Sequence, residues 1–180
     1  VIQKLEDAGA VLVAKLVSGA LARGDVWFGG KTKNPWDIEQ GASGSSAGSG
    51  SATSAGLVPF ALGTETLGSI TSPSTRNGVT GLRPTYGRVS RHGVMSLSWS
   101  MDKVGPLGRN AEDCAIVFSV IQWKDKNDLT TTDLSFGVDW NRNIKNLKVA
   151  YLKNDIEKDT TKSGNNLSKD LEVLKEIGID

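Results

Sequence analysis

Apolar residues recur at helical spacing over the first eight positions and then form a continuous run. Ile2 and Leu5 fall on one face of a helix predicted over residues 1–8, and Gly9 suits the left-handed residue that ends a helix. The next run, residues 10–17, is rich in β-branched and aliphatic side chains, which favours a buried strand. A helix, a glycine stop and a buried strand in succession are typical of an α/β fold.

The pattern becomes irregular after this run and stays so up to residue 44. Glycine pairs and an Asn-Pro step interrupt residues 18–44, which indicates a long loop. Small residues then predict a helix over 46–55 that packs closely on a sheet, and the apolar run 58–62 predicts a buried strand. A further strand and turn are expected over 76–85.

The last part of the chain carries two helical patterns separated by polar segments. A helix is expected over 110–121, with Asn110 as its N-cap and acidic residues in its first turn. The run 146–153 predicts a strand, and Ser168 is expected to cap a helix that stops at Gly178. The whole chain is therefore expected to form one α/β domain.

Composition narrows the picture without naming a function. The 180 residues carry 21 Lys and Arg against 20 Asp and Glu, so no overall charge points to nucleic acid or to a membrane surface. No apolar run approaches the length of about 18 residues that a membrane-spanning helix needs, and the charged N-terminus does not resemble a signal peptide. The single cysteine, Cys114, rules out an internal disulfide and fits a reducing compartment, which predicts a cytoplasmic protein. Its helical surroundings predict a buried core thiol rather than a nucleophile.

The run from Gly41 to Pro73 is as rich in serine and glycine as a flexible linker. An apolar stretch, LVPFAL, interrupts it, and linkers do not alternate with core segments in this way. Small residues gather where backbones approach closely or where N–H groups must face a ligand. Two serines stand out: Ser45 in the loop GSSAG, and Ser69, which follows it by 24 residues in the turn TETLGSI.

These two serines and their surroundings resemble the amidase signature family. The family's pattern is a GGSSGG-type loop, a small-residue helix, a G-T-[DE]-x-G-G-S-I turn and a proline; the chain carries GASGSSAG, SGSATSAG, GTETLGSI and Pro73 in that order. The likeness continues through residues 78–94 and 98–118. It implies that 1–121 is the central portion of an incomplete amidase signature domain, a mixed β-sheet flanked by helices. Residues 122–180 are assigned to the same domain on a weaker likeness, and the chain is expected to be a fragment.

The resemblance implies a serine hydrolase site that uses no metal or cofactor. Ser69 would be the nucleophile that forms an acyl-enzyme, and Ser45, which follows a cis peptide bond in this family, would relay protons to a lysine base. Consecutive backbone N–H groups of the turn would bind the oxyanion. The remaining residues implied are Thr66, Leu67 and Gly68 for oxyanion and substrate binding, and Ser46, Gly44 and Thr64 for support of the two serines.

The chain departs from the family's pattern at three positions near the nucleophile. Leu67 replaces a glycine; it keeps the N–H group, and its side chain is expected to narrow the acyl pocket. Thr71 stands where arginine is frequent, and Glu65 stands where aspartate is usual. These changes are expected to alter substrate preference more than the type of reaction.

No lysine of the chain matches the family's catalytic base. That lysine lies far upstream of the relay serine within a Lys-Asp pair, and Lys15, Lys31 and Lys33 lack this motif. The base is therefore expected outside residues 1–180. Because a catalytic unit that lacks one member loses most of its rate advantage, the isolated chain is expected to be inactive.

Other catalytic and binding patterns fit the sequence less well. GSSAG matches the G-x-S-x-G elbow and would make Ser46 the nucleophile of an α/β-hydrolase, but no strand precedes it. His92 is the only histidine, and Glu65 is the only carboxylate between it and Ser46, which disfavours a triad in the required order. The run lacks the G-K-[ST] ending of a phosphate-binding loop, and one cysteine with one histidine does not make a usual zinc site.

Two activities follow from the resemblance: an amidase that hydrolyses a small or aryl amide, and the glutaminase (A) subunit of a tRNA-dependent Asp/Glu amidotransferase. The stretch RPTYGRVSR at 83–91 favours the second, whereas Leu67, Thr71 and residues 98–100 depart from that group and favour the first. A non-catalytic member used as a binding module would be expected to lack one of the two serines, and both are present. The implied partners are a small-molecule amide and either a second copy of the chain or amidotransferase subunits. Membrane binding and direct nucleic-acid binding are not expected.

Overall fold

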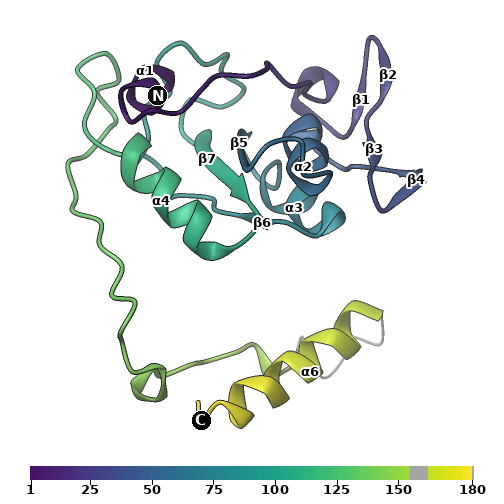
Figure 1. Cartoon of the computed structure of the whole chain (residues 1–180), viewed down its shortest axis with the longest axis vertical. Coiled ribbons are helices and arrows are strands. Elements are labelled where there is room, and N and C mark those ends of the chain that lie inside the picture. Colours follow the sequence, from purple (N-terminus) through teal and green to yellow (C-terminus); the bar gives the residue numbers. More distant parts are fainter. Residues whose placement is uncertain (155–161, 180) are drawn as a thin grey trace. The chain divides into compact units, whose positions relative to one another are not determined.

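The structure, a computed structural model, describes residues 1–154 and 162–179 (Figure 1). The chain divides into two compact units, Val1–Gly137 and Val138–Asp180. The first unit holds a three-stranded sheet with helices beside it, so the α/β class expected from the sequence is confirmed. The expectation of one domain over the whole chain stays a prediction.

Strand β7 (Lys103–Gly108) is the centre of the sheet in the first unit. It pairs antiparallel with β5 (Phe60–Glu65) on one side and with the short β6 (Thr80–Gly81) on the other. The register sets Glu65 opposite Lys103. The end of β5 and the start of β7 therefore lie side by side, and the candidate site forms there.

The helices of the first unit lie around this sheet (Figure 1). Helix α2 (Ala47–Ser54) lies against β5 and α3 (Thr71–Asn77), and α4 (Ala111–Ile121) packs on β7. Helix α1 (Ile2–Asp7) in turn packs on α4. A cluster of buried apolar side chains fills the space between them: Leu5, Val89, Val104, Val117, Phe118 and Ile121.

Glycines follow the first two helices, and the sequence predicts the first of them as a helix stop. Gly9 has a φ of +89°, and its N–H group donates to the Glu6 carbonyl at 2.9 Å. The Ala10 N–H group donates to the Leu5 carbonyl at 2.9 Å, which completes the pair of bonds of a left-handed helix end. Gly56, with a φ of +71°, follows α2 in the same conformation. Helix α1 thus stops at the glycine that the sequence marks, and α2 matches the helix expected over 46–55 to within one residue at each end.

Three further elements of the first unit match their predictions. The strand expected over 58–62 is present as β5, shifted toward its C-terminal side, and the region 76–85 contains β6. The helix expected over 110–121 is α4, with Asn110 as its N-cap. Cys114 is buried in α4 at 2% exposure, and this burial raises the pKa of its thiol.

The strand expected over residues 10–17 is wrong. No strand is found there, and Val11, Leu12 and Val13 are 63–82% exposed. An apolar run identifies a segment suited to burial, but a strand also needs a neighbour for its backbone N–H and C=O groups. Within the described residues no strand pairs with this segment, so its apolar side chains stay exposed.

The segment 18–44 is more regular than its composition indicates, so the expected long loop is corrected. It contains a short 3-10 helix and two antiparallel hairpins: η1 (Ala20–Ala22), β1 (Val26–Trp27) with β2 (Gly30–Lys31), and β3 (Lys33–Asn34) with β4 (Asp37–Gly41). Strands of this length carry too little alternation of apolar and polar residues to be found from sequence.

The strand expected over 146–153 in the second unit is also wrong. The 3-10 helix η2 (Ile144–Asn146) occupies its start, and no strand follows in the described residues of this unit. The alternating apolar residues of the segment again lack a neighbouring strand to pair with.

The helix expected over 168–178 is present but longer than predicted. Helix α6 (Lys162–Glu176) contains most of it and begins at Lys162, so Ser168 is not its N-cap. Gly178 follows the helix with a φ of +84° and donates to the Lys175 carbonyl at 3.0 Å, as a stop residue should. No helix within 1–154 or 162–179 is long and apolar enough to cross a membrane.

The Asn110 cap gives a direct test of the fold. Its side-chain oxygen accepts the N–H group of Asp113 at 2.7 Å at the start of α4. Asn110→Ala should lower the free energy of unfolding by about 1 kcal/mol because this N–H group loses its acceptor. Asn110→Ser keeps an acceptor and serves as the control. Urea denaturation measures both, and equal stability of the two variants would contradict the cap.

Candidate active site

A buried carboxylate fixes the turn between β5 and α3. Glu65, the last residue of β5, is 1% exposed, and one of its oxygens accepts the N–H groups of Ile70 at 2.7 Å and Thr71 at 2.9 Å. The same oxygen lies 3.2 Å from the Thr71 hydroxyl, and Arg83 approaches the other oxygen at 3.5 Å. These bonds supply the acceptors that the first N–H groups of α3 need. Ser69 is therefore held in a turn anchored at its far end.

The middle of this turn presents backbone N–H groups. The N–H groups of Leu67, Gly68 and Ser69 meet no acceptor among the described residues. Leu67 is not among the residues with positive φ, so a side chain is compatible with this backbone. Leu67 is 74% exposed and does not line the adjacent pocket, and its effect on the acyl site stays a prediction.

The second serine lies in the loop that leads into α2. The peptide bond between Gly44 and Ser45 is cis, as the resemblance implied. Ser45 is 2% exposed, and its carbonyl accepts from the N–H group of Gly19 at 2.9 Å and the hydroxyl of Ser18 at 3.0 Å. A side chain at position 44 would collide with the Gly24 carbonyl, which explains the glycine there.

Ser46 ties this loop to the turn that carries Ser69. Its hydroxyl donates to the Thr64 carbonyl at 3.1 Å and accepts the Thr64 N–H group at 3.0 Å. Its own N–H group donates to the Ser69 carbonyl at 3.1 Å. Because the hydroxyl already bridges two backbone groups of one residue, this geometry favours a supporting role over that of a nucleophile.

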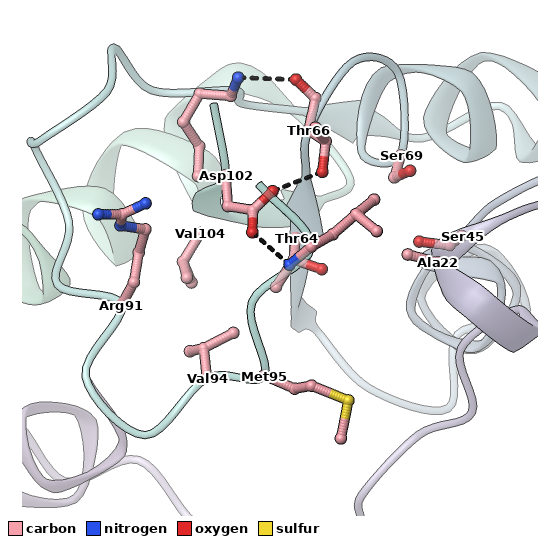
Figure 2. A pocket seen from close by; sticks show the side chains of 12 residues that line it. Ala22, Ser45, Thr64, Thr66, Ser69, Arg91, Val94, Met95, Asp102 and Val104 are labelled. Atoms are coloured by element: carbon pink, nitrogen blue, oxygen red, sulfur yellow. Dashed lines mark hydrogen bonds between the residues drawn. The ribbon is translucent and has the colours of Figure 1, made fainter. Parts of the chain in front are cut away.

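One pocket of the first unit brings the two key serines together (Figure 2). Ser45 and Ser69 line one side of it with Thr64 and Thr66. Leu67, Gly68, Gly44 and Ser46 adjoin these residues in the chain without lining the pocket. The remaining lining residues are Ala22, Arg91, Val94, Met95, Leu97, Asp102, Lys103 and Val104.

Asp102 connects the turn to the opposite wall of the pocket, and the sequence pattern had indicated no role for it. One carboxylate oxygen accepts the Thr66 hydroxyl at 2.5 Å. The other accepts the N–H groups of Leu97 at 2.7 Å and Ser98 at 2.9 Å, with the Ser96 hydroxyl at 3.4 Å. Burial raises the pKa of Asp102, but these hydrogen bonds outweigh it and leave the pKa below its ordinary value.

Arg91 is a second lining residue that sequence reasoning did not single out. Its guanidinium donates to the Trp99 carbonyl at 2.6 Å and to the Tyr86 hydroxyl at 2.8 Å, and it lies 3.6 Å from the Asp128 carboxylate. These bonds hold the segment that contains Val94 against the body of the unit. The only sequence signal for Arg91 was its place in the stretch that resembles the family.

The expectation that no strand precedes the GSSAG loop is wrong, because β4 ends at Gly41; this strand is mostly exposed, however, and is not the buried strand from which an elbow projects its nucleophile. The other rival assignments find little support in this geometry. The Glu65 carboxylate accepts the N–H groups of Ile70 and Thr71 at the start of α3. The backbone N–H group of His92 donates to the Ser90 hydroxyl at 3.1 Å. Lys15, Lys31 and Lys33 do not line the pocket. Within the described residues no group of three or more His, Cys, Asp or Glu side chains is placed to hold a metal ion.

The first unit thus sets two serines in one pocket beside a turn whose N–H groups meet no acceptor among the described residues. The family model described as Amidase matches residues 1–180, so the chain belongs to the amidase signature family. The architecture likewise matches that of solved amidase signature structures, as the resemblance implied.

Three relatives illustrate the range of sequence identity and coverage. The A subunit of the glutamyl-tRNA(Gln) amidotransferase of Saccharolobus solfataricus is 41% identical over 87% of this chain and 34% of its own length. The peptide amidase of Stenotrophomonas maltophilia is 41% identical with a TM-score of 0.71, over 76% of this chain and 30% of that one. An amidase family protein from Bacillus anthracis is 29% identical with a TM-score of 0.84, over 99% of this chain and 38% of that one. The chain spans about a third of the length of the curated relatives it matches.

The lowered pKa of Asp102 predicts how stability depends on pH. A carboxyl whose pKa is lower in the folded state stabilises the fold above its ordinary pKa of about 4, and this contribution is lost as the pH falls through the folded-state value. Asp102→Asn should therefore be less stable at neutral pH by about 1–3 kcal/mol and decline less steeply on acidification.

Urea denaturation across a pH series measures this effect. Asp7→Asn, at an exposed carboxylate of α1, is the control for the loss of one surface charge. Parallel curves for wild type and Asp102→Asn would show that the Asp102 hydrogen bonds do not stabilise its charged form.

Proposed function

We propose that these residues form the serine half of an amidohydrolase site. The observation that carries the proposal is that Ser45 and Ser69 line one pocket beside a turn with free N–H groups. Ser69 Oγ attacks the amide carbonyl carbon, and its proton passes to Ser45, whose own proton passes to a base. The carbonyl oxygen becomes an oxyanion.

The turn stabilises this oxyanion through backbone donors. The N–H groups of Leu67, Gly68 and Ser69 are fixed in place by the anchored turn, so they need little reorganisation when charge develops. The C–N bond then breaks while the departing nitrogen receives a proton through Ser45. Water attacks the acyl-enzyme, transfers its proton along the same path, and regenerates the Ser69 hydroxyl.

The proposal places the base outside residues 1–180. In the family it is a lysine in a Lys-Asp pair, and the lysines upstream of Ser45 neither match that motif nor line the pocket. Residues 1–180 by themselves are then an incomplete catalytic unit. A reducing compartment such as the cytoplasm fits the single buried thiol, Cys114.

Two substrate classes fit this chemistry. The relative from Saccharolobus solfataricus is named as part of an amidotransferase, which favours glutamine as the amide and partner subunits as the assembly. The peptide amidase is equally identical over a smaller part of this chain, but further curated relatives at 40–42% identity are also named as amidotransferase A subunits, so the comparisons support the amidotransferase class better. Thr71 in place of arginine, and an apolar pocket wall of Val94, Met95 and Leu97, favour a small uncharged amide. Turnover of glutamine against 4-nitroacetanilide distinguishes them.

Ser69→Ala tests the nucleophile in the full-length protein. A fluorophosphonate probe should label one serine in the 63–76 peptide of the wild type, and the variant should lose both labelling and amide hydrolysis. Ser72→Ala, an exposed serine one turn further on, is the control and should label normally. A label that persists in Ser69→Ala, or that maps to Ser46, would assign the nucleophile elsewhere.

Ser45→Ala tests the relay separately. This variant keeps the nucleophile but breaks the proton path, so acylation should slow by about 100-fold or more while the protein stays folded. Stopped-flow measurement of probe labelling gives the acylation rate, and circular dichroism checks the fold. Wild-type acylation by a folded Ser45→Ala protein would exclude Ser45 from proton transfer.

A further inference from the structure

The first peptide of the oxyanion turn is held by a side chain from the neighbouring strand. The side-chain nitrogen of Lys103, the first residue of β7, donates to the Thr66 carbonyl at 2.9 Å. Figure 2 draws this bond as the upper dashed line that ends at Thr66. We propose that Lys103 is a positioning residue, which aims the Leu67 N–H group at the substrate oxygen; the inference rests on the proposed function.

The geometry of a peptide unit links the two groups. The Thr66 carbonyl and the Leu67 N–H group belong to one peptide bond. Among the described residues only the Gly44–Ser45 bond is cis, so the Thr66–Leu67 bond is trans. In a planar trans peptide the C=O and N–H bonds point in opposite directions. Holding the carbonyl toward Lys103 therefore turns the N–H group away from Lys103 and fixes its direction.

Lys103 binds the carbonyl of Thr66, whose side-chain hydroxyl also makes a hydrogen bond. The Thr66 hydroxyl donates to Asp102, the residue before Lys103 in the chain. The far end of the turn is held by Glu65 through Ile70. The turn is thus fixed at both ends, and Lys103 is the contact that sets the orientation of the peptide nearest to β7.

Lys103 could act as a general base instead of a positioning residue. Lys103 lines the same pocket as Ser45 and Ser69, so it is also placed as a candidate proton acceptor. Arginine distinguishes the two roles, because it donates hydrogen bonds but does not lose its proton in proteins. A positioning role survives Lys103→Arg, whereas a role as base does not.

The test compares Lys103→Met, Lys103→Arg and Lys103→Gln in the full-length protein with 4-nitroacetanilide and glutamine as substrates. Lys103→Met keeps the length of the side chain without a donor, and its kcat should fall about 10- to 100-fold, less than on deletion of an oxyanion donor. KM should stay within about two-fold, because the N–H group acts on the transition state more than on the bound amide. Lys103→Arg and Lys103→Gln each keep a donor and should recover most of kcat without changing the pH profile.

Controls separate this inference from the proposed function. Lys124→Met changes an exposed lysine outside the pocket and should leave kcat unchanged, and thermal melting confirms that each variant folds. Wild-type kcat in folded Lys103→Met would overturn the positioning role. Inactivity of folded Lys103→Arg, with loss of the acidic limb of the pH profile in Lys103→Gln, would overturn it in favour of a base, because a base acts only in its unprotonated form. Full turnover by Ser69→Ala would remove the proposed function itself, whatever the Lys103 variants do.

Discussion

The buried carboxylate of Glu65 is the constraint on which the rest of the site depends. It closes the turn after β5 by accepting the N–H groups of Ile70 and Thr71. Without this acceptor the N–H group of the fully buried Ile70 would be unpaired at the start of α3, at a cost of about 1–3 kcal/mol. Since Ser69 directly precedes Ile70, the hydrogen bonds of Glu65 to Ile70 and Thr71 fix the position of Ser69, although Ser69 makes neither bond.

The site is assembled from three segments that the sheet brings into register. The β5–β7 pairing sets the start of β7 beside the end of β5, so Asp102 and Lys103 reach Thr66. The loop before α2 is joined to the same turn through Ser46. Most of these links end on backbone atoms, which explains why the geometry depends on strand register as much as on the identity of any one residue.

Sequence reasoning located what is encoded locally. The helix ends at Gly9 and Gly178 and the Asn110 cap are set by residues near one another in the chain, and these predictions are confirmed, whereas the roles of Ser45 and Ser69 stay predictions. The strand expected over 10–17 failed because an apolar run says nothing about whether a neighbouring strand is present. Asp102 and Lys103 were overlooked for a related reason: their partner Thr66 lies far from them in the sequence, and only the β5–β7 register brings them together.

The free donors of the turn are main-chain groups, and this has a consequence for how such a protein diversifies. Leu67 occupies a glycine position of the family, yet its N–H group is retained and its side chain faces outward. Mutation at such a position changes the molecular surface without deleting a donor. Related proteins can therefore change side chains around the turn, and with them their specificity, while the backbone N–H donors of the turn are retained.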